Sequence, residues 1–229
     1  MGLFTLEELD EDGAFLDATA RVHGPTRAEF LRTAVVGGAG LLAALASPPR
    51  DALAAADDTS ILQFDLAFEY MQATFYTESE QMGTVDKMTP AMARWARTFG
   101  THERAHVKIL KDVLGAAAPK KPFFNFRGVT ENPDDFAKTA VAMEDLTTAL
   151  LSGQAPRFNS RPLVAAIFSL LTVEARHAAW VRHVVGSDPV LHAFDEPKSL
   201  AEVGRVVDAT NFFARRPITQ ASEVPSFTG

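Results

Sequence analysis

The chain has 229 residues, a net charge of −7, a pI of about 5.4 and 47% hydrophobic residues, values typical of a globular protein with one apolar core. No cluster of Lys and Arg stands apart from acidic residues, so we expect no nucleic-acid partner. The chain has no cysteine, which excludes disulfides, thiolate–metal sites and iron–sulfur clusters. Any metal chemistry must therefore use Glu, Asp and His.

The first 57 residues are predicted to form an N-terminal extension. After an acidic stretch over residues 1–25 come a basic segment around Arg27, an apolar run over residues 34–46 and a proline pair, the order of an export signal. The segment resembles a twin-arginine signal in which Ala28 replaces the second arginine, and it predicts export to the periplasm, the cell envelope or the medium. The alternative is an N-terminal helix on a cytoplasmic protein. Because the apolar run has only 13 residues and a spanning helix needs about 20, we expect no integral membrane span.

From residue 58 onward the sequence predicts four long helices and a short fifth one. Apolar residues recur at spacings of three and four, which is typical of helices with one buried face, and no strand-like alternation competes. Proline near the first position and glycine at the end mark the helix boundaries. The expected helices run from about residue 60 to 81, 90 to 115, 133 to 153, 160 to 186 and 199 to 213. We therefore predict one domain over residues 58–213, followed by a C-terminal tail over residues 214–229.

Each of the four long helices carries an acid within its apolar stripe. A lone ionised carboxylate in a core costs several kcal/mol, so these acids need partners. Their order along the chain is Glu, Glu-x-x-His, Glu, Glu-x-x-His. The residues are Glu69, Glu103, His106, Glu144, Glu174 and His177. Residues three apart share one side of a helix, so the Glu and His of each pair can point at the same place.

The positions of these acids along the helices also match. Glu69 lies 14 residues before Gly83, and Glu103 lies 13 residues after Pro90, so in an antiparallel hairpin both lie about 20 Å from the turn. The acids of the last two helices lie 9 and 12 residues from their turn, a looser match. The linker over residues 116–131 can extend about 50 Å, enough to cross the bundle and make the third helix parallel to the second.

The charges of the six residues predict a metal centre. Four carboxylates and two neutral imidazoles sum to −4, which two divalent cations would cancel. Because carboxylate-rich sites favour iron or manganese, we predict two divalent metal ions, Fe or Mn, at the centre of the bundle. The alternative is a metal-free interior in which the acids form buried ion pairs with Arg94, Arg104 or Arg176 and the histidines are ordinary core residues.

Three further side chains lie near the predicted ligands in the sequence. Tyr76 is seven residues after Glu69 and Asp65 is four residues before it, so both share its helix face. Each is predicted either to hydrogen-bond a ligand or to serve in packing alone. His102 is adjacent to Glu103, and we expect it to have a structural role on the flank of the helix.

Because of these residues, the chain resembles members of the ferritin-like superfamily. The resemblance rests on Leu66–Tyr70 with Phe75 and Tyr76, on Glu103–Val107 and on Glu174–Ala179, and it covers about residues 59–213. Within the superfamily the chain is similar to bacterial ferritin-like domain proteins related to plant desiccation-related proteins. The resemblance implies an all-α, ferritin-like four-helix bundle of two antiparallel hairpins joined by a long crossover, with a short fifth helix. It also implies that Glu103 and Glu174 bridge the two metals.

The resemblance implies an oxidoreductase-type reaction with oxygen or hydrogen peroxide, in protection against oxidative or desiccation stress. The expected reactions are ferrous oxidation, peroxide reduction and peroxide disproportionation as in the manganese catalases. The rival hypothesis is a metal-stabilised structural or stress protein without turnover. An iron-storage cage is disfavoured because the terminal extensions do not look like subunit-packing helices, and a smaller homo-oligomer is left open.

Overall fold

The computed structural model describes residues 52–214, with side chains from residue 58 onward. The predicted export signal and nearly all of the C-terminal tail lie outside the described residues. Within residues 52–214 there are five α-helices and two short strands. They are α5 (Ala52–Gln81), α6 (Pro90–Leu114), β1 (Phe123–Phe124), α7 (Pro133–Gln154), α8 (Arg161–Val184), α9 (Leu200–Thr210) and β2 (Phe213–Ala214). The prediction of an all-α fold with four long helices and a short fifth one is confirmed.

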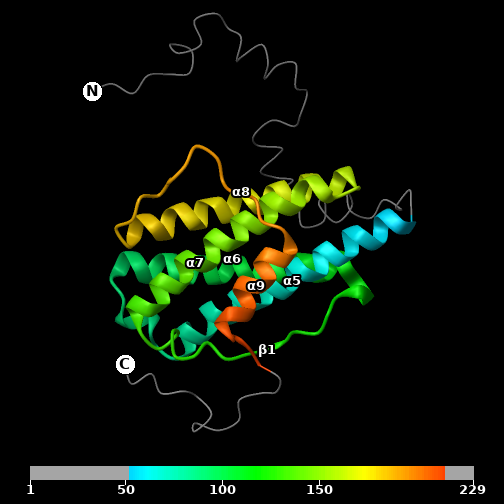
Figure 1. Ribbon diagram of the computed structural model, residues 1–229. Coiled ribbons are helices and arrows are strands. Elements are labelled where there is room, and N and C mark those ends of the chain that lie inside the picture. Colours follow the sequence, from blue (N-terminus) through cyan, green and yellow to red (C-terminus); the bar gives the residue numbers. More distant parts are fainter. Residues whose placement is uncertain (1–51, 215–229) are drawn as a thin grey trace, which may run out of the picture. The chain divides into compact units, whose positions relative to one another are not determined.

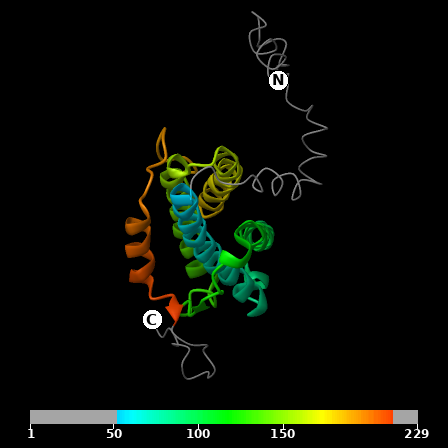
Figure 2. The same ribbon diagram turned by 90° about the vertical axis from the view of Figure 1, so that its right-hand side faces the viewer.

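Helices α5 to α8 form a four-helix bundle (Figure 1). Helix α5 packs mainly on α6, and α7 packs mainly on α8, so the bundle consists of two hairpins that meet through α5–α7 and α6–α8 contacts. The crossover between α6 and α7 returns along the length of the bundle (Figure 1), as predicted. Seen from the side in Figure 2, the four helices surround a common interior, and α9 packs outside them against α7.

Several helices begin with side-chain caps. The Thr89 hydroxyl accepts a hydrogen bond from a backbone N–H in the first turn of α6, directly before Pro90. The Asn132 side chain accepts two such bonds at the start of α7. Ser199 and Glu202 form a reciprocal capping box at α9. These caps satisfy N–H groups that have no partner within the helix, and so determine where each helix begins.

Two helix boundaries differ from the prediction. Helix α5 begins at Ala52 because the alanine-rich residues before position 58 continue the helix. Gly153 was expected to end the third helix, but it lies inside α7, which continues to Gln154. The reason for glycine here is steric, since a Cβ at this position would lie 2.0 Å from the carbonyl oxygen of Lys198. The backbone N–H of Lys198 also donates to the carbonyl of Ala149 at 2.9 Å, which holds the segment before α9 against α7.

The short sheet was not predicted. Strands β1 and β2 are antiparallel, with Phe123 paired with Ala214 and Phe124 with Phe213. The backbone N–H of Asn125 extends the contact by donating to the carbonyl of Phe212 at 2.8 Å. Two residues per strand are too few to produce a detectable alternation in the sequence. The sheet joins the crossover to the chain that follows α9.

The interior of the bundle contains two apolar clusters. We call the first the aromatic cluster; its members include Phe68, Phe75, Tyr76, Trp95, Phe99, Phe126, Phe136 and Phe212. The second, the aliphatic cluster, includes Ile61, Leu62, Leu66, Leu110, Leu114, Leu151 and Ile167. Along α5 most members of the aliphatic cluster come before position 69 and most of the aromatic cluster after it, with Phe68 and Tyr70 as the exceptions beside Glu69, and along α6 the order is reversed. A layer between the two clusters is therefore left for the polar residues.

Helix α8 is the one helix within residues 52–214 that is long and apolar enough to cross a membrane, judged by length and composition. In the bundle it packs on α7 and α6 and buries Glu174 and His177. It leaves Phe168 and Trp180 about half exposed. The absence of an integral membrane span stays a prediction.

Candidate metal centre

The six residues that the sequence singled out lie together in the layer between the aromatic and aliphatic clusters. Helix α5 contributes one glutamate, α6 a glutamate and a histidine, α7 one glutamate, and α8 a glutamate and a histidine. They are Glu69, Glu103, His106, Glu144, Glu174 and His177. The four glutamates and the α8 histidine are at most 3% exposed, and the side chain of the α6 histidine is 13% exposed. The structure thus brings all six predicted site residues into one buried place.

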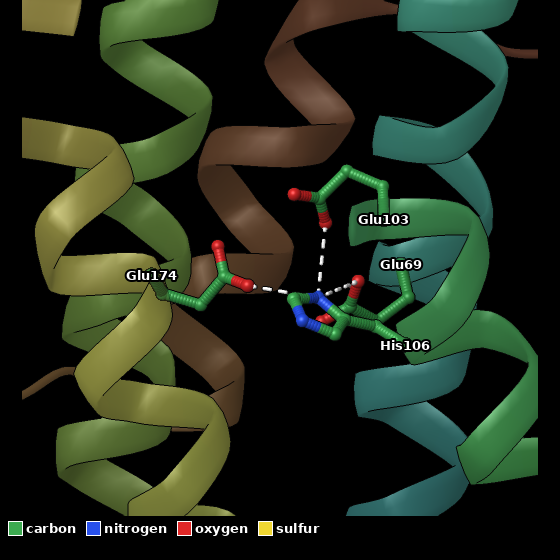
Figure 3. A group of neighbouring side chains, drawn as sticks. All are labelled: Glu69, Glu103, His106 and Glu174. Atoms are coloured by element: carbon green, nitrogen blue, oxygen red, sulfur yellow. Dashed lines mark ion pairs between the residues drawn. The ribbon is translucent and has the colours of Figure 1, made fainter. Parts of the chain in front are cut away.

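One half of the site surrounds the imidazole of His106 (Figure 3). Its Nδ1 atom lies 3.5 Å from Oε2 of Glu69 and 3.4 Å from Oε2 of Glu103. The third carboxylate is that of Glu174 on α8, and its Oε1 lies 2.9 Å from the same nitrogen (Figure 3). Three helices therefore supply the groups of this half.

The other half surrounds the imidazole of His177. Its Nδ1 atom lies 3.1 Å from Oε1 of Glu103 and 3.4 Å from Oε2 of Glu174. Oε2 of Glu144, from α7, lies 3.5 Å from the same nitrogen. This half again draws on three helices, two of which also serve the first half.

Glu103 and Glu174 belong to both halves. Each directs one carboxylate oxygen toward His106 and the other toward His177. In each half the four potential ligand atoms, one per residue, lie within 4.8 Å of one another, so each half could hold a metal ion. Two groups of four that share two carboxylates have the arrangement of a dinuclear site with two bridging glutamates.

The donor atoms of this cluster fit metal ions because they are buried and lie close to one another without forming well-directed hydrogen bonds. Among residues 52–214, no hydrogen bond satisfies either oxygen of Glu103 or Glu174, Oε2 of Glu69 and Glu144, or Nδ1 of either histidine. Buried polar atoms without partners are rare, and each costs about 1–3 kcal/mol. Carboxylate oxygens and imidazole nitrogens are the ligands that iron and manganese take in proteins, so cations would satisfy these atoms.

The alternative in which arginines neutralise the acids is wrong. Arg104 turns away from the site and contacts Glu80 and Thr77. The Nε–H of Arg176 donates to the carbonyl of Thr172 in its own helix, and Arg94 is exposed. Within the described part of the chain, the site acids form ion pairs with the two imidazoles.

In the absence of cations, the electrostatics of the site favour protonated imidazoles. Burial lowers the pKa of His177, but its contacts with Glu103, Glu144 and Glu174 outweigh burial and raise that pKa to about 12. The pKa of Glu103 falls to about 2, because the close contacts and the charge of the two imidazoles exceed the opposing effect of burial. Burial raises the pKa of Glu144 to about 8. A cation must therefore displace protons to reach the imidazole nitrogens.

Tyr76 and Asp65 differ in their relation to the cluster. The buried Tyr76 hydroxyl donates a hydrogen bond to Oε1 of Glu144, and burial together with the charge of Glu144 raises the pKa of Tyr76 well above its usual value. Asp65 is 1% exposed, and neither of its oxygens has a hydrogen-bond partner among the described residues. Burial raises the pKa of Asp65 to about 8. Tyr76 thus holds a ligand carboxylate, whereas Asp65 orients none of the six side chains by a hydrogen bond.

His102 was expected on the flank of the helix, and that expectation was wrong. Its Nδ1 atom lies 2.9 Å from Nε2 of His177, and the two rings are nearly parallel. The signal was present in the sequence: His102 precedes His106 by four residues, and residues four apart share a helix face. His102 therefore faces α8, where His177 lies.

Comparison with known proteins agrees with this geometry. A family model of the ferritin-like domain matches residues 57–187, which is more than half of the chain and includes all six residues of the cluster. The chain therefore belongs to the ferritin-like domain family, and its bundle is ferritin-like as predicted. A search of curated proteins finds no match.

Proposed function

We propose that this protein binds two divalent metal ions, iron or manganese, and uses them in a redox reaction with oxygen or hydrogen peroxide. One ion takes Glu69, Glu103, His106 and Glu174, and the other takes Glu103, Glu144, Glu174 and His177. The observation that carries the proposal is the pair of four-ligand groups that share two buried carboxylates whose oxygens form no hydrogen bond.

The reaction class follows from the donor set and from access to the site. Iron and manganese held by carboxylates and imidazoles change oxidation state against oxygen or peroxide. The cluster is buried apart from the slightly exposed side chain of His106, so the approach favours small oxidants over large substrates. We therefore propose ferrous oxidation, peroxide reduction or peroxide disproportionation. From the sequence resemblance to desiccation-related proteins, we also propose a role in protection against oxidative or desiccation stress.

The first test is metal content. Protein expressed with iron and manganese both available should hold about two metal atoms per chain by elemental analysis, the number expected for two bridged positions. Glu144→Ala and His177→Ala should each reduce this number, and Glu103→Ala should bring it near zero because both positions lose a bridge. The matched control is Glu80→Ala, a partly exposed acid on α5 that pairs with Arg104 outside the cluster. Wild-type protein without metal, or equal metal in Glu103→Ala, would contradict the proposal.

The second test is turnover. Metal-loaded protein is mixed with hydrogen peroxide, and metal-free protein with Fe(II) and air, while oxygen evolution, peroxide loss and iron oxidation are followed. We expect at least one of the three above buffer, and none in Glu103→Ala. If the protein binds metal but oxygen evolution, peroxide loss and iron oxidation all stay at the level of buffer, the redox function is excluded and the proposal of metal binding is unaffected.

A metal-stabilised structural or stress protein is the second candidate. It is favoured by one observation: each group of four ligands takes residues from both hairpins, so bound cations would tie the hairpins together. In that case a redox-inert ion such as Zn(II) would raise the melting temperature as much as Mn(II) does, and no turnover would be found.

Export and self-association are also proposed, from the sequence alone. Export rests on the basic and apolar residues 26–56, and cell fractionation of the full chain tests it. A storage cage is disfavoured, and a smaller homo-oligomer is left open. Size-exclusion chromatography distinguishes them, because a cage of 24 chains would elute far earlier.

A further inference from the structure

The imidazole of His177 is held on three sides. Its Nδ1 faces the carboxylates of the cluster, while Phe99 stacks on its ring with a centroid distance of 3.9 Å. The remaining nitrogen, Nε2, lies 2.9 Å from Nδ1 of His102, and the planes of these two rings differ by 11°. His102 is half-buried on α6, so it joins the buried imidazole to the edge of the bundle.

The contact between the two histidines determines which nitrogen of His177 can bind a cation. A ligating nitrogen must present its lone pair, so when Nδ1 of His177 is the ligand its ring proton lies on Nε2. The Nε2–H of His177 then donates to Nδ1 of His102. A hydrogen bond of this kind fixes both the tautomer and the orientation of a ligating imidazole.

The two halves of the site differ in whether a histidine precedes the Glu-x-x-His motif and can hydrogen-bond the ligating imidazole of the other half. His102 directly precedes Glu103 in the first Glu-x-x-His motif, and the residue in the same position of the second motif is Val173. A valine side chain has no hydrogen-bonding group and cannot hold an imidazole in the same way. The side chain of His106 is also more exposed than that of His177, at 13% against 3%.

We propose that His102 is a positioning residue that holds His177 through its Nε2, and that the metal position beside His177 is therefore the tighter of the two. The inference rests on the proposed dinuclear site. It goes beyond that site by assigning a role to a residue that is not a ligand and by making the two metal positions unequal.

Calorimetric titration of the metal-free full chain with Zn(II) tests the inference. Wild-type protein should show two binding events of different affinity. His102→Ala should weaken the tighter event about 10- to 100-fold, the usual effect of losing the partner of a ligating histidine. His102→Asn should restore most of the affinity, because the asparagine Oδ1 occupies the place of Nδ1 and accepts the same hydrogen bond. The control is His183→Ala, an exposed histidine of α8, which should leave both events unchanged.

A second measurement needs no variant. In Zn(II)-loaded wild-type protein, ¹⁵N NMR should show His177 with Nε2 protonated and Nδ1 bound to zinc. The opposite tautomer, an unchanged titration of folded His102→Ala, or equal weakening by His102→Asn and His102→Ala would each overturn the role of His102. No zinc binding by wild-type protein would instead overturn the proposed metal site, and this inference with it.

Discussion

Asp65 shows how a single buried acid affects stability. Burial raises its pKa from 3.8 to about 8, so between these values the folded protein keeps a proton that the unfolded chain releases. The stability contributed by this group is therefore present at low pH and is lost as the pH rises from about 4 to about 8. We predict that Asp65→Asn gains stability over wild type progressively through this window. Urea unfolding of both metal-free proteins at pH 5, 7 and 9 measures the difference, and a difference independent of pH would contradict the prediction.

Tyr76 stabilises one ligand without competing for the atom that faces the metal position. Its hydroxyl donates to Oε1 of Glu144, whereas Oε2 faces His177. Tyr76→Phe should lower the free energy of unfolding of the metal-free protein by about 1–3 kcal/mol, because a buried carboxylate oxygen loses its donor. Metal content should stay near that of wild type. Tyr70→Phe is the control, since Tyr70 is buried in the aliphatic cluster, outside the site. Equal losses in the two variants would show that the hydrogen bond contributes nothing.

The six clustered residues were predictable because charge inside an apolar stripe is unusual and helical spacing is regular. The spacing of His102 and His106 indicates their shared helix face, but the contact between His102 and His177 could not be predicted, because it depends on how closely α6 approaches α8. The sequence also could not distinguish the bonded Tyr76 from the unpaired Asp65. Both lie on the helix face of Glu69, but of the two only Tyr76 has a hydrogen-bond partner on α7, Glu144, within the described residues.

At the scale of elements, we predict that a glycine-to-alanine substitution changes the free energy of unfolding in opposite directions at Gly153 and Gly204. Gly153→Ala places a Cβ 2.0 Å from the carbonyl oxygen of Lys198, so we expect a loss of about 1–3 kcal/mol from overpacking. Gly204 lies in α9, and a Cβ there meets no atom within 4 Å. Gly204→Ala should therefore stabilise the protein by about 0.5–1 kcal/mol through helix propensity. Chemical denaturation measures both, and a stabilising Gly153→Ala would show that the segment before α9 yields easily.

The helices could be predicted because local signals determine their ends. Caps and prolines such as Thr89-Pro90 and Asn132-Pro133 act within one turn, so sequence reveals them. Gly153 looked like a helix end, yet its role depends on Lys198, which is 45 residues away in sequence and adjacent in space. The pairing of β1 with β2 is likewise non-local. Such contacts leave no periodic pattern in the chain.

At the scale of the whole molecule, metal binding should stabilise the fold by mass action. Mn(II) at about 1,000 times its dissociation constant should add about 4 kcal/mol per independent site, because the unfolded chain does not assemble the ligands. Thermal unfolding at increasing Mn(II) measures this gain as a rising melting temperature. Glu103→Gln should lose most of the rise, and Glu80→Gln should keep it. A rise of the same size in Glu103→Gln would mean that Mn(II) stabilises the protein from some other place.

The origin of the ligands in both hairpins has a kinetic consequence. Each proposed metal position would take groups from the α5–α6 hairpin and from the α7–α8 hairpin. An ion cannot leave by the swing of one side chain, because several ligands on opposing helices must part together. Its escape would require the hairpins to move apart transiently, so the residence time of the ion would report how often the bundle opens along the seam between them.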